Sequence, residues 1–134
     1  MAGRVNEAIQ SAQKAATLLP RDAEAQKNLG FAYFRGGKFN EAAEAYRTAA
    51  DISPANPEIK NNLGQSYFKL NKFQDALAAF KDAVRLEPEY AQAHLNLGLT
   101  YVLLKDPKGV RAELAVLQTL DPKLADQLRA FDKK

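Results

Sequence analysis

Apolar residues recur every three or four positions along the chain, the spacing at which side chains line one face of an α-helix. Residues 4–19 show the pattern first, with Val5, Ala8, Ile9 and Ala12 on one face and polar residues between them. The same spacing returns after each short break that contains glycine, asparagine or proline. The pattern therefore predicts an all-α chain of consecutive helices.

Helix start signals precede several of these apolar segments. Asp22 and Asn56 stand directly before two of them, and a side-chain oxygen at such a position accepts hydrogen bonds from the free N–H groups of the first turn. Asp106-Pro107 and Asp121-Pro122 combine the cap with a proline, whose missing N–H is no loss at the first helical position. We expect helices to begin directly after these caps.

A motif of Asn-Leu-Gly occurs three times, and its glycines Gly30, Gly64 and Gly98 lie 34 residues apart. A tyrosine follows three residues after each glycine, and alanine, aromatic and proline positions recur with the same period. A period of this length indicates a solenoid, in which pairs of helices bury their apolar faces by stacking on their neighbours. The single domain over 1–134 is expected to divide into the second helix of a truncated repeat (4–22), three full repeats (23–56, 57–90 and 91–124) and a C-terminal capping helix (121–132).

The third repeat departs from the other two after its tyrosine. Gly37 and Asn71 suit the left-handed backbone of a helix C-cap, whereas the third turn reads Lys105-Asp106-Pro107 and is expected to work by different chemistry. The following helix carries Leu114 where the earlier repeats carry an aromatic residue. The last helix has an apolar face and a polar face, as the end of a stack requires.

Composition narrows the function classes. The chain has 134 residues, is 46% hydrophobic and 26% charged, and carries a net charge of +3, values typical of a folded domain. Its basic residues are scattered and often stand near acids, so nucleic-acid binding is not expected. There is no cysteine and no apolar run of about 18 residues, so we expect neither disulfides nor membrane insertion. The default localisation is cytoplasmic; the chain begins in mid-repeat, and an upstream targeting segment would change that expectation.

Catalytic signals are absent from the sequence. It contains no glycine-rich phosphate loop, no metal-ligand spacing and no nucleophile with a nearby base. We therefore expect no enzyme activity, no cofactor and no metal site. His94 is the only histidine, and a structural role is favoured for it over a catalytic one.

The pattern Leu-Gly-x₂-Tyr, Ala-x₃-aromatic and Pro at a period of 34 resembles the tetratricopeptide repeat (TPR) over essentially the whole chain. One departure is the family's tryptophan position, which holds Gln26, Lys60 and His94. The resemblance implies an α-solenoid with a right-handed superhelix, whose first helices line a concave groove. It also implies a protein–protein interaction module, an adaptor or scaffold, that binds a peptide or protein segment there.

Carrying the family's groove positions onto this chain gives one row of residues in each full repeat. The first row is Glu24, Lys27, Asn28, Phe31, Phe34 and Arg35; the second is Glu58, Asn61, Asn62, Gln65, Phe68 and Lys69; the third is Gln92, Leu95, Asn96, Leu99, Val102 and Leu103.

Three alternatives remain open at the level of sequence. Asn28, Asn62 and Asn96 either contact a ligand or serve packing. The phenylalanines of the first two rows are interpreted as groove floor in preference to core. The apolar third row either lines the groove or lies under the last helix or a missing domain.

One known binding mode of the family is not expected. A clamp of lysine, arginine and asparagine side chains grips the terminal carboxylate of chaperones in some tetratricopeptide proteins. Lys27 and Asn62 occupy two of its positions, but Phe31, Gln92 and Asn96 occupy the others, so the cationic part is mostly lost. An alternative function is structural: the apolar edge of 4–19 lacks its partner helix, so the chain either extends a longer solenoid or forms a homo-oligomer through this end.

Overall fold

The chain folds into helices joined by short turns. A computed structural model describes residues 2–133, with the side chain of Ala2 left out of the description, and these residues form eight α-helices and no strand. The expectation of an all-α solenoid is confirmed. The helices are α1 (Ala2–Leu18), α2 (Ala23–Arg35), α3 (Phe39–Ile52), α4 (Pro57–Lys69), α5 (Phe73–Leu86), α6 (Ala91–Leu103), α7 (Pro107–Leu120) and α8 (Pro122–Asp132).

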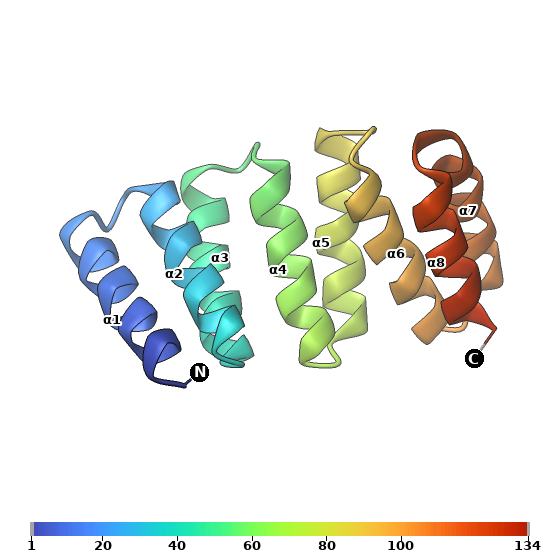
Figure 1. Ribbon diagram of the computed structural model, residues 1–134. Coiled ribbons are helices and arrows are strands. Elements are labelled where there is room, and N and C mark those ends of the chain that lie inside the picture. The colour runs from blue at the N-terminus through green and yellow to red at the C-terminus, as the bar shows by residue number, and fades with distance from the viewer. Residues whose placement is uncertain (1, 134) are drawn as a thin grey trace.

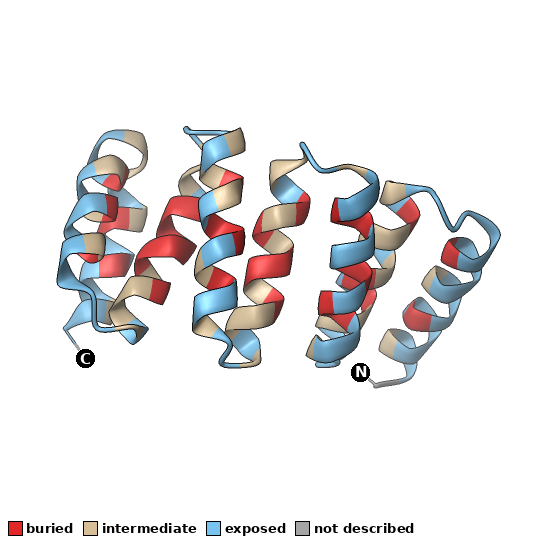
Figure 2. Cartoon of the chain, turned by 180° about the vertical axis from the view of Figure 1, so that it is seen from behind, coloured by how far each residue is buried: buried red, intermediate tan, exposed pale blue. Residues whose placement is uncertain are grey.

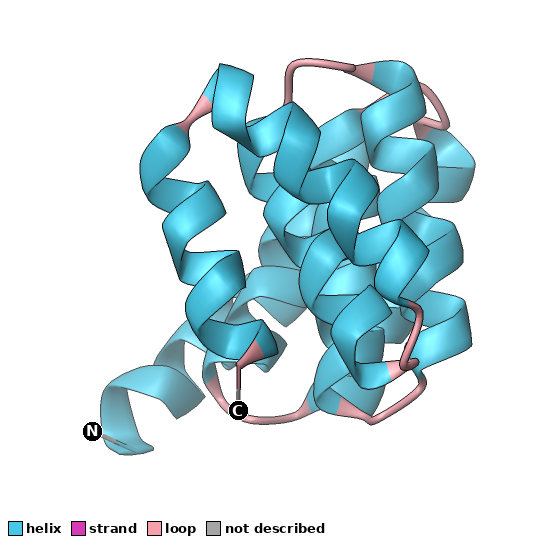
Figure 3. Cartoon of the chain, turned by 90° about the vertical axis from the view of Figure 1, so that its right-hand side faces the viewer, coloured by secondary structure: helices cyan, strands magenta, loops and turns pink. Residues whose placement is uncertain are grey.

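The helices stack in order along one axis, and each packs against the next (Figure 1). Helix α4 also contacts α2 and α6, and these three helices form one layer, while α3, α5 and α7 lie behind them. Figure 3 looks along this stack from its C-terminal end. The residues that face outward from the first layer therefore come together from three different repeats.

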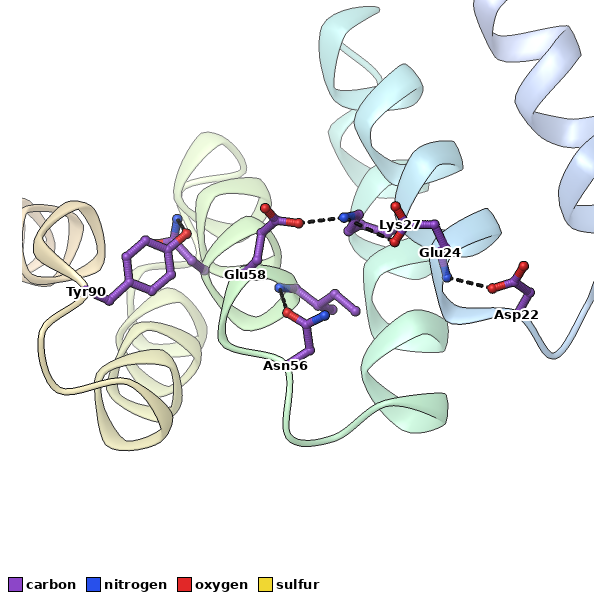
Figure 4. Close-up of polar contacts among 8 residues, drawn as sticks. Asp22, Glu24, Lys27, Asn56, Glu58 and Tyr90 are labelled. Atoms are coloured by element: carbon purple, nitrogen blue, oxygen red, sulfur yellow. Dashed lines mark hydrogen bonds and ion pairs between the residues drawn. The ribbon is translucent and has the colours of Figure 1, made fainter.

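The helix caps form as the sequence predicts. Asp22 Oδ1 accepts a hydrogen bond from the backbone N–H of Glu24 (3.0 Å), and Asn56 Oδ1 accepts one from that of Ile59 (3.2 Å). Both caps appear in Figure 4. Asp106 and Asp121 cap α7 and α8 in the same way, at 3.1 Å each. Because these bonds satisfy free N–H groups, they fix where the helices begin.

The three turns inside the repeats share one backbone geometry. Gly37, Asn71 and Lys105 have φ values of 74°, 61° and 58°, all in the left-handed region. After each of them the next backbone N–H returns to a tyrosine carbonyl; in the third turn Asp106 N donates to Tyr101 O at 3.0 Å. Lys105 thus takes the conformation that glycine takes in the first turn. The side-chain chemistry of the third turn differs as expected, because Asp106 caps α7 whereas Lys38 and Lys72 make no side-chain cap.

Glycine allows the two helices of a repeat to approach closely. A Cβ atom on Gly30 would lie 2.8 Å from the Tyr46 ring, and one on Gly64 would lie 2.5 Å from the Phe80 ring. Contacts this short do not occur between real side chains, so the ring of one helix occupies the space above the glycine of the other. Tyr46 and Phe80 are consequently among the most buried side chains of the chain.

In the third repeat a residue from a different helix packs above the glycine. The space above Gly98 is filled by Leu128 of α8, which would lie 2.5 Å from a Cβ there, and Leu114 of α7 is only half-buried. Leu114 stands at the repeat position of the buried aromatic residues, but this position does not predict how far Leu114 is buried. Helix α8 packs against both α6 and α7, so it belongs to the core of the last repeat as well as closing the stack.

Candidate protein-binding site

A pocket lies where α2, α4 and α6 adjoin, with a volume of about 310 Å³. We call it the central pocket. Six of its seven lining residues are among the predicted groove residues, and they come from all three rows; the seventh is Phe80, a buried residue of α5. The lining residues are Phe34, Gln65, Phe68, Lys69, Phe80, Asn96 and Leu99.

Two phenylalanines form the apolar part of the central pocket and are held in place by neighbouring rings. Phe34 meets Phe39 edge to face with ring centroids 5.1 Å apart, and Phe68 meets Phe73 in the same way at 5.3 Å. Such edge-to-face pairs fix the orientation of both rings. Phe34 and Phe68 are half-buried and also pack on core clusters, so they serve as pocket wall and as core together.

Two predicted groove asparagines lie in the interior. Asn61 and Asn96 are only 3% and 7% exposed. Asn96 Nδ2 donates to Asn61 Oδ1 at 2.9 Å, and Asn61 Nδ2 donates to the Tyr90 hydroxyl at 3.3 Å. The prediction that Asn61 faces the groove is wrong, because its amide is used between α4 and α6. Asn96 has this packing role and also contributes to the pocket lining.

The remaining asparagines differ from these. Asn28 is exposed on α2 and Asn62 is half-buried on α4. The three asparagines that share one position in the repeat therefore have three different environments. Their common position in sequence does not make them equivalent, because only the Asn96 amide is bonded to a buried amide of the neighbouring helix.

The third row is partly covered by the last helix. Leu95 is 4% exposed and belongs to the buried cluster formed with α7 and α8, so its prediction as a groove residue is wrong. Val102 is half-buried against the same cluster, and Leu99 packs on it while also lining the central pocket. Leu103 remains exposed. Of the two alternatives for the third row, Leu95 therefore follows the second, because it lies under the last helix and does not line the groove.

Part of the first row lies outside the central pocket. Asn28, Phe31 and Arg35 line a second hollow of about 530 Å³ between α1 and α2, which we call the N-terminal groove. Phe31 is 53% exposed, and the Arg35 guanidinium lies 5.7 Å from the centroid of its ring. The other lining residues are Arg4, Val5, Ala8, Ser11, Ala12, Ala15 and Ala32.

Lys27 is engaged with two carboxylates. Its Nζ lies 2.6 Å from Glu58 Oε1 of α4 and 3.2 Å from Glu24 Oε2 of its own helix (Figure 4). The hydrogen bond to Glu58 holds the pKa of Lys27 above its ordinary value. The two carboxylates therefore already compensate the positive charge of the Lys27 ammonium group. Lys69, by contrast, is exposed at the central pocket.

His94 lies in the interior and joins three segments. Its Nε2 donates to the Pro88 carbonyl at 2.7 Å, and its Nδ1 lies 2.6 Å from Glu113 Oε1 of α7. Burial raises the pKa of Glu113, and the hydrogen bond to His94 acts in the opposite direction. This arrangement agrees with the structural role predicted for His94.

Between positions 2 and 133, no group of three or more histidine, cysteine, aspartate or glutamate side chains is placed to hold a metal ion. None of the described helices is long and apolar enough to cross a membrane.

Comparison with known proteins identifies similar repeats and similar folds. A family model described as TPR repeat matches residues 32–71 and 64–105. The crystal structure of MamA aligns with a TM-score of 0.85 and 22% identity, over 98% of this chain and 86% of that chain. The Arabidopsis OM64 TPR domain aligns with a TM-score of 0.77 and 23% identity, over 83% of this chain and 93% of that chain.

A third solved structure contains a peptide. It is the first TPR of Spaghetti (RPAP3) bound to the HSP90 peptide SRMEEVD, with a TM-score of 0.77 and 28% identity, over 84% of this chain and 91% of that chain. No curated protein matches the chain.

Proposed function

The chain belongs to the TPR repeat family, whose members are generally protein-interaction modules, and on this premise we propose that it is a non-catalytic adaptor or scaffold that binds a peptide segment in the central pocket. The observation that carries the proposal is the convergence of predicted groove residues from three helices on this pocket. Its volume of about 310 Å³ suits a few side chains of an extended segment better than a whole helix.

The chemistry of the central pocket favours a particular kind of segment. The Phe34 and Phe68 rings offer an apolar wall, and Gln65 supplies an amide that can pair with a peptide backbone as donor and acceptor. Lys69 adds one exposed cation. We infer that the ligand inserts a large apolar side chain and carries an acidic residue next to it.

The test is a peptide selection followed by a matched pair of variants. Peptides selected from a random library against the whole chain are measured by fluorescence anisotropy against wild type, Leu99→Arg and Gln74→Arg. Leu99 lines the pocket, whereas Gln74 is exposed on α5 outside it. Arginine in the pocket should weaken binding at least about tenfold, a loss of roughly 1.4 kcal/mol.

The control arm decides what the result means. Gln74→Arg should bind like wild type, and circular dichroism should show equal helicity for all three chains. Equal affinity of the Leu99→Arg variant for every selected peptide would place the binding surface elsewhere and overturn the proposal.

We also propose that the chain does not bind the carboxylate ends of chaperone peptides. Lys27 is already paired with Glu58 and Glu24, and Asn96 is buried against Asn61. Phe31 and Gln92 supply no cation at two further positions of the clamp. The peptide SRMEEVD should therefore show no saturable binding in calorimetry, and tight binding weakened by salt would contradict this expectation.

A second candidate function is structural. The exposed alanines Ala8 and Ala15 on α1 leave an apolar surface at the N-terminal end of the stack, which favours self-association through this end. Sedimentation at high protein concentration tests this candidate, since a chain that remains monomeric there does not stack on itself.

A further inference from the structure

The turn that joins the two helices of each full repeat carries a pair of exposed cations. In every pair the two residues stand three positions apart. The pairs are Arg35 and Lys38, Lys69 and Lys72, and Lys105 and Lys108. We call these six residues the turn cations. The first two pairs recur at the 34-residue period, and the third pair stands two positions later.

The fold brings the turn cations to one edge of the stack. In Figure 1 the turns between α2 and α3, between α4 and α5, and between α6 and α7 follow one another along the same edge. Figure 2 shows these turns from the opposite side, and they are largely exposed there. Basic residues that are scattered in the sequence therefore form one row in the structure.

The turn cations differ from basic residues elsewhere in what they contact. Lys27, Lys60 and Arg85, which lie within helices, each form an ion pair with a carboxylate. Between positions 2 and 133, no turn cation is part of an ion pair. Arg35 contacts the Phe31 ring, which leaves its charge uncompensated. The row is therefore available to a negatively charged partner.

One carboxylate accompanies each pair of turn cations. Glu41 and Asp75 are exposed in the first turns of α3 and α5, and Asp106 caps α7 by accepting the Gly109 N–H. Two cations and one carboxylate leave each turn with an excess of positive charge. The excess has the same sign in all three repeats, so a matching partner offers a negative charge to each turn in succession.

A second copy of the chain does not offer such a series of charges. The opposite edge of the stack has few carboxylates that recur one repeat apart, and these are already engaged. Glu24 and Glu58 are paired with Lys27, and Asp121, one repeat after Glu87, caps α8. The acidic groups that meet the turn cations therefore come from a different molecule.

The spacing of the row specifies the form of this molecule. Helix α4 contacts both α2 and α6, and packed helices lie about 8–10 Å apart. An extended peptide advances about 3.3 Å per residue, so three residues cover about one such step. An acidic side chain at every third position of an extended peptide therefore meets one turn after another. A lipid surface or a flexible polyanion has no such requirement of spacing.

Lys69 connects the row to the central pocket. It ends α4 and also lines the pocket beside Phe34 and Phe68. A segment that inserts an apolar side chain into the central pocket therefore passes the second turn. This continuity favours a peptide over a lipid surface as the partner of the row.

We infer that the turn cations bind acidic residues of the extended segment whose apolar side chain enters the central pocket. The segment belongs to another protein and carries an acidic residue at every third position, one for each turn. This inference rests on the proposed function for the peptide nature of the ligand, and it adds the spacing of charges by which the ligand is selected.

The test uses two peptides of identical composition. The spaced peptide has seven residues, with glutamate at its first, fourth and seventh positions, phenylalanine at its fifth and serine elsewhere. The clustered peptide has its glutamates at the first, second and third positions and keeps the phenylalanine in place. Both are acetylated and amidated, which removes the charges of their ends. Their affinities for the whole chain are measured by fluorescence anisotropy.

Wild type should bind the spaced peptide about fivefold more tightly than the clustered one, because exposed charge pairs are individually weak and three act together here. Salt should reduce this preference. A turn variant that combines Lys38→Gln, Lys72→Gln and Lys108→Gln should lose it, because each remaining turn cation is then balanced by the carboxylate of its turn.

A matched control removes the same charge outside the three turns. It combines Lys14→Gln, Arg21→Gln and Lys123→Gln, all at exposed positions. The control should keep the preference of wild type, and circular dichroism should show equal helicity for all three chains.

A second pair of peptides, with serine in place of phenylalanine, separates this inference from the proposed function. If the central pocket does not hold the apolar side chain, this replacement changes neither affinity, while the preference for the spaced peptide persists. If the turn cations are not the site, the preference is absent whether or not the phenylalanine contributes.

Equal affinity of wild type for the spaced and clustered peptides, including no binding of either, overturns the inference, as does a preference that the turn variant keeps. With equal affinities, cosedimentation of wild type but not of the turn variant with phosphatidylserine vesicles would assign the row to a lipid surface. A sedimenting dimer that the turn variant makes monomeric would assign it to a second copy.

Discussion

At the scale of single residues, the turns show how one backbone conformation can be met by different side chains. Gly37, Asn71 and Lys105 share a left-handed φ, although only the first lacks a Cβ atom. This conformation costs an ordinary L-residue about 1–2 kcal/mol. The backbone of Lys105 is therefore strained, and the hydrogen bonds of the turn keep it in this conformation.

Replacing Lys105 by glycine should relieve this strain. We expect Lys105→Gly to raise the free energy of unfolding by about 1 kcal/mol, the strain relieved less the extra flexibility that glycine gives the unfolded chain. Urea unfolding measures the change. Lys72→Gly is the matched control, because Lys72 has a φ of −91° and should gain nothing. A Lys105→Gly variant no more stable than wild type would show that the turn is unstrained.

At the scale of elements, His94 and Glu113 join α6 to α7 and to the segment that precedes α6. The His94 ring donates to Pro88 with one nitrogen and faces Glu113 with the other. It stands at the position where the family usually has a packed tryptophan. In the third repeat a buried polar pair thus joins α6 to α7 and to the segment before α6.

The buried glutamate makes the stability of this junction depend on pH. Burial raises the folded-state pKa of Glu113 above its ordinary value of 4.5. A raised pKa means that the folded state holds the Glu113 proton more tightly than the unfolded state does. The stability that this proton contributes is fully present below the ordinary pKa and is lost as the pH rises through the folded-state pKa. The unfolding free energy of wild type should therefore fall relative to that of Glu113→Gln as the pH increases.

Urea unfolding of both chains from about pH 4 to about pH 8 measures this difference, with a slope of at most ~1.4 kcal/mol per pH unit for one proton. Glu41→Gln, at an exposed glutamate of α3, controls for the loss of one charge. A wild type that gains stability relative to Glu113→Gln with rising pH would show that the charged pair stabilises the fold.

At the scale of the whole molecule, the stack has two unlike ends. At the C-terminal end α8 covers α6 and α7, and Leu128 fills the space above Gly98. At the N-terminal end α1 contacts α2 alone among the helices that the structure describes, and Ala8 and Ala15 of its apolar face are exposed. Because each helix contacts only helices one or two places away in the stack, the stability of such a stack is close to a sum of local contributions.

Local stability predicts a local response to damage. Leu128 is fully buried, so Leu128→Ala should cost about 2–5 kcal/mol through the cavity it leaves. Hydrogen exchange should show the loss of protection in α6, α7 and α8, while α2 and α3 keep theirs. Gln127→Ala, at an exposed position of the same helix, should change little. Equal loss in all helices would mean that the chain unfolds as one unit.

Much of the fold could be predicted because its signals are local. The caps at Asp22 and Asn56, the turn at Gly37 and the proline after each second helix depend on residues next to one another in the chain. The 34-residue period then predicts stacking, since each helix pair can bury its apolar face only against a similar pair. Most residues that line the central pocket stand at groove positions of the same repeat.

The candidate site was predicted less well, because its residues depend on contacts between repeats. Asn61 and Asn96 occupy groove positions in sequence but bond to one another across two helices. Leu95 has a groove position and is buried by α8, a helix outside the repeat pattern. Phe31 and Phe34 are three residues apart on one helix and line different hollows.

The sequence by itself determined the helices, their caps, their period and the family of the fold, because hydrophobic spacing and capping act over a few residues. Only the tertiary structure decided which side chains are free to meet a partner. Accessibility depends on what the next repeat or the last helix places above a residue, and a regular repeat has irregular ends. For the same reason Ala8 and Ala15 of α1 are exposed, whereas Ala42 and Ala49, one period later, are buried.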